Sequence, residues 1–322
     1  MNKRNQITEG VIWKQLLLFF FPIVFGTFFQ QIYNTADTIV VGRFVGKEAL
    51  AAVGGSVNQI VNLIVEVFVG LTSGAAVVVS QFFGAQDRKN LDKTVHTSFA
   101  FSLAAGAIIG VAGFLLSDAV LEAMNTPVEL MADSRTYLHI YFMGIVFNLV
   151  YNMGASVLRA MGDSRRPLYV LMTACILNIV LDIVLVVAAG MGVRGVAIAT
   201  VSCQGVSAVL VTGMLMRDHG FFRLEIKNIR FYGASLKAIL RIGVPAGIEA
   251  AMYCGKYCDT GICKSSGNRL CSCLGHFWEN RCRILDGSQC LFHCDYYLCG
   301  TELWRRQNKT NAKKCAGVSG NV

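Results

Sequence analysis

Long apolar segments separated by short polar ones make up the first two thirds of the chain. A helix needs about 20 mainly apolar residues to cross the hydrocarbon core of a bilayer. The first apolar segment, which begins near Ile12 and ends near Gly42, is too long and too apolar for a soluble helix. Six segments reach the required length, at residues 16–41, 52–80, 97–117, 136–158, 168–190 and 195–216. The pattern predicts an all-α, polytopic membrane protein with a six-helix lobe over residues 1–216.

A change of pattern follows this lobe. Residues 217–241 alternate charged and apolar side chains, which fits either a solvated cytoplasmic linker or a helix lying on the inner membrane surface. Residues 242–253 are again apolar with helical spacing, and they predict the start of a seventh helix. The apolar pattern stops at Cys254.

Composition and charge narrow the class of protein. The chain is 54% hydrophobic and only 15% charged, and its mean hydropathy is +0.51, which leaves too little polar surface for a soluble domain of 322 residues. The net charge of +9 does not indicate nucleic-acid binding, because the basic residues lie between apolar segments. Residues 1–10 are polar and no small-residue cleavage site follows, so we expect the first span to stay in the membrane.

The basic residues are unevenly shared between alternate connectors. Four alternate connectors hold 15 Lys and Arg residues: Lys3, Arg4 and Lys14 at the N-terminus; Arg88, Lys89 and Lys93 in 81–96; Arg159, Arg165 and Arg166 in 159–167; and Arg217, Arg223, Lys227, Arg230, Lys237 and Arg241 in 217–241. The intervening connectors hold four: Arg43, Lys47, Arg135 and Arg194. Because positively charged loops stay in the cytoplasm, we predict a multi-pass protein of the cytoplasmic membrane with its N-terminus inside.

Ten of the twelve cysteines fall in residues 254–322. A zinc module would use closely paired cysteines, but no Cys-x-x-Cys pair occurs there, so we expect no metal site. A disulfide scaffold fits no better, because it would follow a helix too short to cross the bilayer.

A third interpretation of residues 254–322 is translation in the wrong reading frame. Back-translation of Cys299–Ala316, read from the second nucleotide of each codon, permits VGQNYGAGKTKRMQKSVR. This aligns without a gap to Val79–His96, VSQFFGAQDRKNLDKTVH, 220 residues earlier. Lys14 and Pro22 also recur as Lys237 and Pro245, 223 residues later. These repeats predict two similar six-helix halves, with a frameshift near residues 253–254 and a disordered tail over 254–322.

Several short motifs resemble the multidrug and toxic compound extrusion (MATE) family: N-T-A-D-T-I-V-V-G (34–42), A-L-A-A-V-G (49–54), Q-F-F-G-A (81–85), L-R-A-M-G-D-S-R-R-P (158–167), N-I-V-L-D (178–182) and G-V-R-G-V-A-I-A-T (192–200). The resemblance covers residues 1–253, the amino-terminal lobe of the family. It implies a twelve-helix transporter with a cleft between two lobes. It also implies export of organic, often cationic, compounds in exchange for protons or sodium ions.

Polar residues within the spans carry the candidate chemistry. Asp37 and Asp182 are acids at membrane depth, and Asn178 precedes Asp182 by one helical turn on the same face. A buried carboxylate is costly in its charged form, so protonation can compete there with binding of a cation. The resemblance adds Thr200, which matches a polar position of the same cluster in part of the family. The alternatives are a structural acid near the outer interface for Asp37, polar contacts between helices for Asn178 and Asp182, and a backbone hydrogen bond for Thr200.

Two further acids are candidates for the cleft. Glu66 lies near the middle of the second span, where facing lipid would be costly; either contact with cationic compounds or pairing with a partner within the protein fits this position. Glu249 follows Pro245 in the seventh segment, where the resemblance places a coupling acid in part of the family.

The sequence therefore predicts a cation-coupled multidrug antiporter, not an enzyme, that is inactive as this truncated chain. We expect no cofactor apart from the coupling ion, H⁺ or Na⁺. The expected partners are small organic substrates and the lipid bilayer, with no nucleic acid, and the expected state is a monomer. Two alternatives stay open: a lipid-linked precursor flippase of the related superfamily, and a membrane fragment without transport activity.

Overall fold

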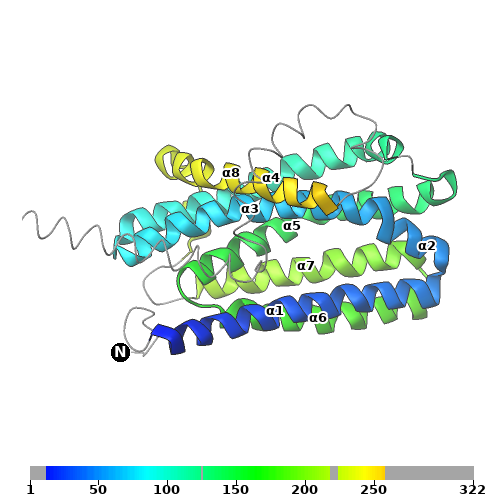
Figure 1. Ribbon diagram of the computed structural model, residues 1–322, viewed down its shortest axis with the longest axis horizontal. Helices are drawn as coiled ribbons and strands as arrows, with labels where there is room; N and C mark the ends of the chain where they lie inside the picture. Colours follow the sequence, from blue (N-terminus) through cyan, green and yellow to red (C-terminus); the bar gives the residue numbers. More distant parts are fainter. Residues whose placement is uncertain (1–11, 125, 218–223, 258–322) are drawn as a thin grey trace, which may run out of the picture.

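The computed structural model describes residues 12–124, 126–217 and 224–257, and residues 258–322, with the cysteine-rich segment, lie outside the described residues. All regular elements in the described part are helical, and Figure 1 shows the long helices side by side along one axis. In chain order they are α1 (Ile12–Val40), η1 (Val41–Val45), α2 (Lys47–Ala52), η2 (Val53–Val57), α3 (Asn58–Gly84), α4 (Arg88–Ala123), α5 (Val128–Ala160), α6 (Arg165–Asp182), η3 (Ile183–Ala188), α7 (Gly192–Met216), η4 (Ile226–Asn228) and α8 (Gly233–Tyr257).

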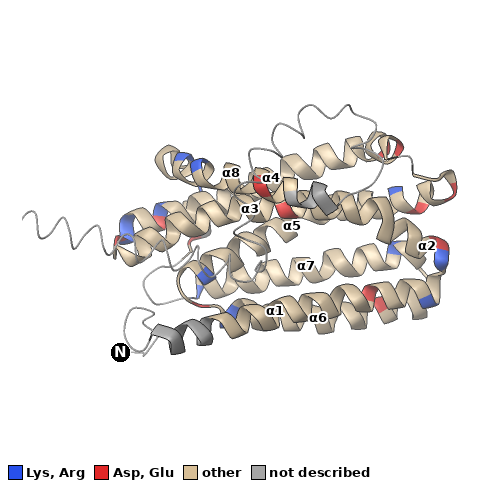
Figure 2. Cartoon of the chain, viewed as in Figure 1, with Lys and Arg blue, Asp and Glu red and all other residues tan. Residues whose placement is uncertain are grey.

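Five helical segments of the described chain are long and apolar enough to cross a membrane: Lys47–Gly84, Arg88–Ala123, Val128–Ala160, Arg165–Ala188 and Gly192–Met216. They correspond to five of the six predicted spans, which confirms an all-α, polytopic membrane protein. The first predicted span, 16–41, falls almost wholly within α1, a helix of 29 residues that is not among these five. In Figure 2 most Lys and Arg residues lie toward the ends of the bundle.

The helices extend beyond the apolar segments. The predicted 81–96 connector shrinks to a turn of three residues, because α3 ends at Gly84 and α4 begins at Arg88. The Asp87 side chain caps α4 by accepting a hydrogen bond from the Asn90 backbone N–H at 3.1 Å. Likewise α8 begins at Gly233, so the seventh helix starts nine residues before residue 242, where the sequence predicted its start. Charged residues in the first turns of a helix can lie outside the bilayer, and hydropathy alone does not find such turns.

The packing order places α1 against α6, α5 between α4 and α7, and α3 against α8. Glycines make the last contact unusually close. A Cβ atom at Gly70 or Gly74 of α3 would overlap the backbone of α8 at Gly247 or Gly243. These glycines are four residues apart on each helix, and the two helices run antiparallel. Small residues at this spacing let helix backbones touch within a membrane.

The segment that joins α7 to α8 is bonded to the start of α4. The ring Nε2 of His96 lies 3.1 Å from both the backbone N and the backbone O of Glu225. The Tyr232 backbone N–H donates to the Thr97 hydroxyl at 3.2 Å. Lys93 and Arg230 both lie over the Tyr232 ring, at 5.7 and 5.1 Å from its centroid. These contacts fix the entry into α8 relative to the lobe.

Candidate functional site

The candidate polar residues come from three neighbouring helices. Asp37 lies near the end of α1, Asn178 and Asp182 lie in the last turns of α6, and Thr200 lies in α7. Asn178 and Asp182 are fully buried, at 0% exposure, and Thr200 is 5% exposed. Asp37 is half-buried. Burial this complete is rare for polar side chains unless they have partners.

These side chains form one cluster. Asp37 lies beside both Asp182 and Asn178. Tyr33, one turn before Asp37 on α1, neighbours both Asp37 and Thr200, and Tyr137 of α5 also neighbours Thr200. The cluster thus joins α1, α5, α6 and α7 through oxygen and amide groups; its members are Tyr33, Asp37, Tyr137, Asn178, Asp182 and Thr200.

Many polar atoms of the cluster make no hydrogen bond within the described part of the chain. They are one carboxyl oxygen of Asp37, both carboxyl oxygens of Asp182, both amide atoms of Asn178 and the hydroxyl of Thr200. A buried polar group without a partner costs about 1–3 kcal/mol. A concentration of such atoms at one place therefore indicates a site arranged for something other than stability.

The backbone changes its helical form at the cluster. Asp182 is the last α-helical residue of α6, and the π-helical turn η3 begins at Ile183. Another π-helical turn, η1, starts at Val41, one turn after Asp37, and packs against η3. Such turns are rare and occur frequently at functional sites, because they redirect side chains without ending the helix. Asp182 therefore directly precedes a point where its helix widens, and Asp37 lies one turn before such a point.

The chemistry of this donor set is that of a small hard cation or of a proton. Carboxylate, carbonyl and hydroxyl oxygens suit ions that prefer hard ligands. Two carboxyl groups side by side in a low-dielectric interior repel each other strongly when both are ionised, so a bound cation or a proton relieves the repulsion. No group of three or more His, Cys, Asp and Glu residues in the described part could hold a metal ion.

Sequence reasoning missed Tyr33, Tyr137 and a further pair, Gln204 with Tyr141. Gln204 lies one turn after Thr200 on α7, its side-chain oxygen is buried without a hydrogen-bond partner, and Tyr141 of α5 neighbours it. A tyrosine or glutamine within an apolar run carries no charge signal, so composition does not single it out. The spacing of four residues from Thr200 to Gln204 is a signal that could have found Gln204.

The two predicted cleft acids are not brought into this cluster. Glu66 is exposed on α3, and Glu249 is half-buried on α8. Neither is a neighbour of Asp37 or Asp182. They remain candidates for a separate role.

Comparison with known proteins identifies the family of this chain. The sequence profile of the MatE family matches residues 22–184, which include Asp37, Asn178 and Asp182. This chain belongs to the MATE family. The MATE motifs found in the sequence thus have their expected family context, whereas the roles of individual residues stay predictions.

Individual relatives agree with this membership. The chain is 32% identical over 253 residues to the probable multidrug resistance protein YpnP of Bacillus subtilis, covering 79% of this chain and 56% of that protein. It is 29% identical over 247 residues to the probable multidrug resistance protein NorM of Thermotoga maritima, covering 75% and 52%. The chain therefore spans about half the length of the curated relatives that it matches.

A solved structure shares the fold. The chain superposes with a TM-score of 0.74, at 24% identity, on an outward-facing MATE-family multidrug resistance transporter of the MOP superfamily. The match covers 89% of this chain and 63% of that one. The chain thus shares the fold of the matched part of that structure.

Proposed function

We propose that this chain carries the cation-coupling lobe of a multidrug antiporter, which exports small organic, often cationic, compounds across the cytoplasmic membrane. In this proposal the cluster around Asp37 and Asp182 takes up H⁺ or Na⁺. The chain alone is inactive, because export requires the second lobe. The observation that carries the proposal is the set of buried acid, amide and hydroxyl groups without hydrogen-bond partners at the meeting of α1, α6 and α7.

The burial of each side chain in the cluster suggests its role in ion binding. Asp37 is half-buried, whereas Asp182 and Asn178 are fully enclosed. Asp37 is therefore the acid that an ion reaches first, and Asp182 with Asn178 forms the inner wall. Thr200 supplies a hydroxyl from α7, which links ion binding to the position of a third helix. Movement of α1 against α6 would alter the distance between the two acids and hence the affinity for the ion.

The orientation in the membrane is part of the same proposal. The charge bias of the connectors supports a cytoplasmic N-terminus. Asp37 is 25 residues after the start of α1 at Ile12, roughly 38 Å along the helix at 1.5 Å per residue. The coupling cluster would then face the external side, from which protons or sodium ions enter.

The test is efflux of a fluorescent organic cation from cells that express the gene with its reading frame restored after codon 253. Asp37→Asn and Asp182→Asn should each abolish efflux that depends on the ion gradient. Asp118→Asn is the matched control, because it changes an acid that is 45% exposed and paired with Arg135 at the far end of α4. Efflux by both cluster variants at the level of the unmodified protein would refute the coupling role.

A second measurement distinguishes the ion. Uptake of the fluorescent cation into inverted vesicles should respond either to a sodium gradient imposed without a pH difference or to a pH difference imposed without sodium. Uptake that follows neither gradient would rule out coupling to either ion. Expression of the 322-residue chain with its own tail should give no efflux above background.

A further inference from the structure

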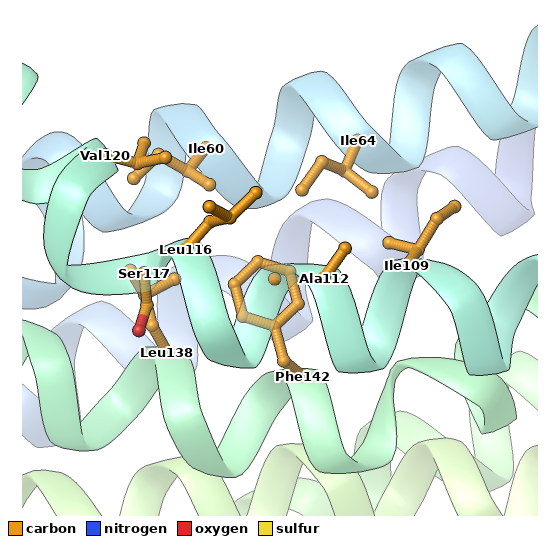
Figure 3. A pocket seen from close by; sticks show the side chains of 10 residues that line it. Ile60, Ile64, Ile109, Ala112, Leu116, Ser117, Val120, Leu138 and Phe142 are labelled. Atoms are coloured by element: carbon orange, nitrogen blue, oxygen red, sulfur yellow. The ribbon is translucent and has the colours of Figure 1, made fainter.

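A narrow apolar crevice lies between α3, α4 and α5, apart from the coupling cluster. It is open along one side and has a volume of about 230 Å³, and nine of its ten lining residues are apolar or glycine. Figure 3 shows Ile60 and Ile64 of α3 facing Leu116 of α4, with the Phe142 ring rising from α5. The ring packs on Gly113, where a Cβ atom would overlap it. The depth of the crevice is therefore set by the absence of a side chain at Gly113.

The crevice opens beside a face of α4 that is suited to lipid. Ile108, Val111 and Leu115 are 69%, 63% and 72% exposed, and they form one row along α4. The crevice residues Ile109, Ala112 and Leu116 form the adjacent row, one position further along the chain. The opening therefore lies on the outer surface of the described helices rather than in the interior of the lobe.

The length of the crevice matches one leaflet. Its lining on α4 runs from Ile109 to Val120, roughly 16 Å at 1.5 Å per residue. A hydrocarbon core is about 30 Å thick, so each leaflet contributes about half of that. The crevice occupies the part of α4 nearest the α4–α5 turn and does not extend along the whole helix.

Polar groups close the end of the crevice nearest that turn. Ser117, the one polar lining residue, lies 2.8 Å from the ring Nε2 of His139. Next to it, Arg135 pairs with Asp118 at 2.8 Å, and these side chains are 54% and 45% exposed. A guanidinium has five N–H donors, so one that is paired through a single nitrogen and half exposed can also bind a phosphate oxygen.

We infer that the crevice holds one acyl chain of a phospholipid from the leaflet on the α4–α5 side, with its phosphate at Arg135. Lipid tails are as apolar as the lining, so apolarity alone gives no preference for this place. The preference comes from filling a void that would otherwise lack van der Waals contacts, together with the charged contact at the head group. The chain thus has a lipid site that is independent of coupling.

The experiment uses the 322-residue chain in nanodiscs that contain a phospholipid with a photoactivatable diazirine in the middle of one acyl chain. After irradiation, mass spectrometry at residue resolution should find the label on the crevice residues Ile109, Ala112 and Leu116 of α4, and not only on the lipid-facing Val111 and Leu115. Ala112→Phe fills the crevice and should lower this labelling at least fivefold. Val111→Phe adds the same ring on the neighbouring lipid-facing row and should leave the labelling unchanged.

Arg135→Ala tests the contact with the head group independently of the crevice. It should weaken labelling by the phospholipid probe and not by a diacylglycerol probe with the same chains. Ile64→Trp serves as a second filling variant, and thermal unfolding of each variant verifies that it is folded. Equal labelling of Ala112→Phe and Val111→Phe would mean ordinary bulk lipid and would overturn the inference. Labelling of other helices without labelling of α4 would overturn it too, since another protein segment would then cover the crevice.

Discussion

Replacing Asp182 with leucine should stabilise the folded chain and at the same time destroy the proposed coupling site. Asp182 is fully buried, and neither of its carboxyl oxygens has a hydrogen-bond partner in the described structure. Leucine has nearly the same shape and leaves no polar atom to satisfy. Removal of an unsatisfied buried polar group is worth about 1–3 kcal/mol. The repulsion between Asp182 and the neighbouring Asp37 disappears as well.

The assay is thermal unfolding of the purified chain in detergent, followed by intrinsic fluorescence. For a chain of this size, 1 kcal/mol corresponds to about 2–4 °C in Tm, so Asp182→Leu should raise Tm by several degrees. Asp118→Leu is the control, because it breaks a half-exposed ion pair worth about 0–1 kcal/mol and should lower Tm slightly. If Asp182→Leu lowers Tm by more than Asp118→Leu does, the carboxyl group has favourable partners in the folded chain and the reasoning fails.

Three further substitutions test other contacts. Gly74→Leu should force α3 away from α8 and destabilise the chain by about 1–3 kcal/mol, whereas Gly213→Leu, with no neighbour within 4 Å, should leave Tm unchanged. His96→Leu removes the ring nitrogen that lies 3.1 Å from the Glu225 backbone N, so hydrogen exchange of that amide should speed up about tenfold, as expected for a loss of about 1–3 kcal/mol. Hydrogen bonds from the first turn of α4 hold the pKa of Asp87 below its ordinary value of 3.8. That contribution to stability is complete above about pH 4 and is lost as the pH falls through the lowered pKa. The protection factors of the amides in this turn, which are corrected for the intrinsic pH dependence of exchange, should therefore decrease in acid, and Asp87→Asn should remove this decrease.

Hydropathy predicted most of the fold, for a physical reason. In a bilayer every backbone polar group must be bonded within the segment, so each long apolar run has to be a helix. The same reasoning fails at helix ends. Arg88–Lys93 were assigned to a loop because they are charged, yet they form the first turns of α4, since water outside the bilayer solvates their side chains.

For the candidate site, acids were easier to predict than their neighbours. Asp37 and Asp182 stand out because charge is rare at membrane depth. Tyr137 and Gln204 resemble ordinary members of apolar helices, and only packing across α5 and α7 reveals that they belong with the acids or beside them. The π-helical turn after Asp182 likewise depends on how η3 packs against η1, which no local pattern specifies.

The glycine contact between α3 and α8 also has a mechanical consequence. Most packed helices are held apart by interlocking side chains. Here backbone lies against backbone at Gly70, Gly74, Gly243 and Gly247. At these positions no side chain lies between the two helices, so backbone contact sets their distance, and any side chain added there would push them apart. The place where α8 joins the lobe is thus fixed by residues that have no side chain.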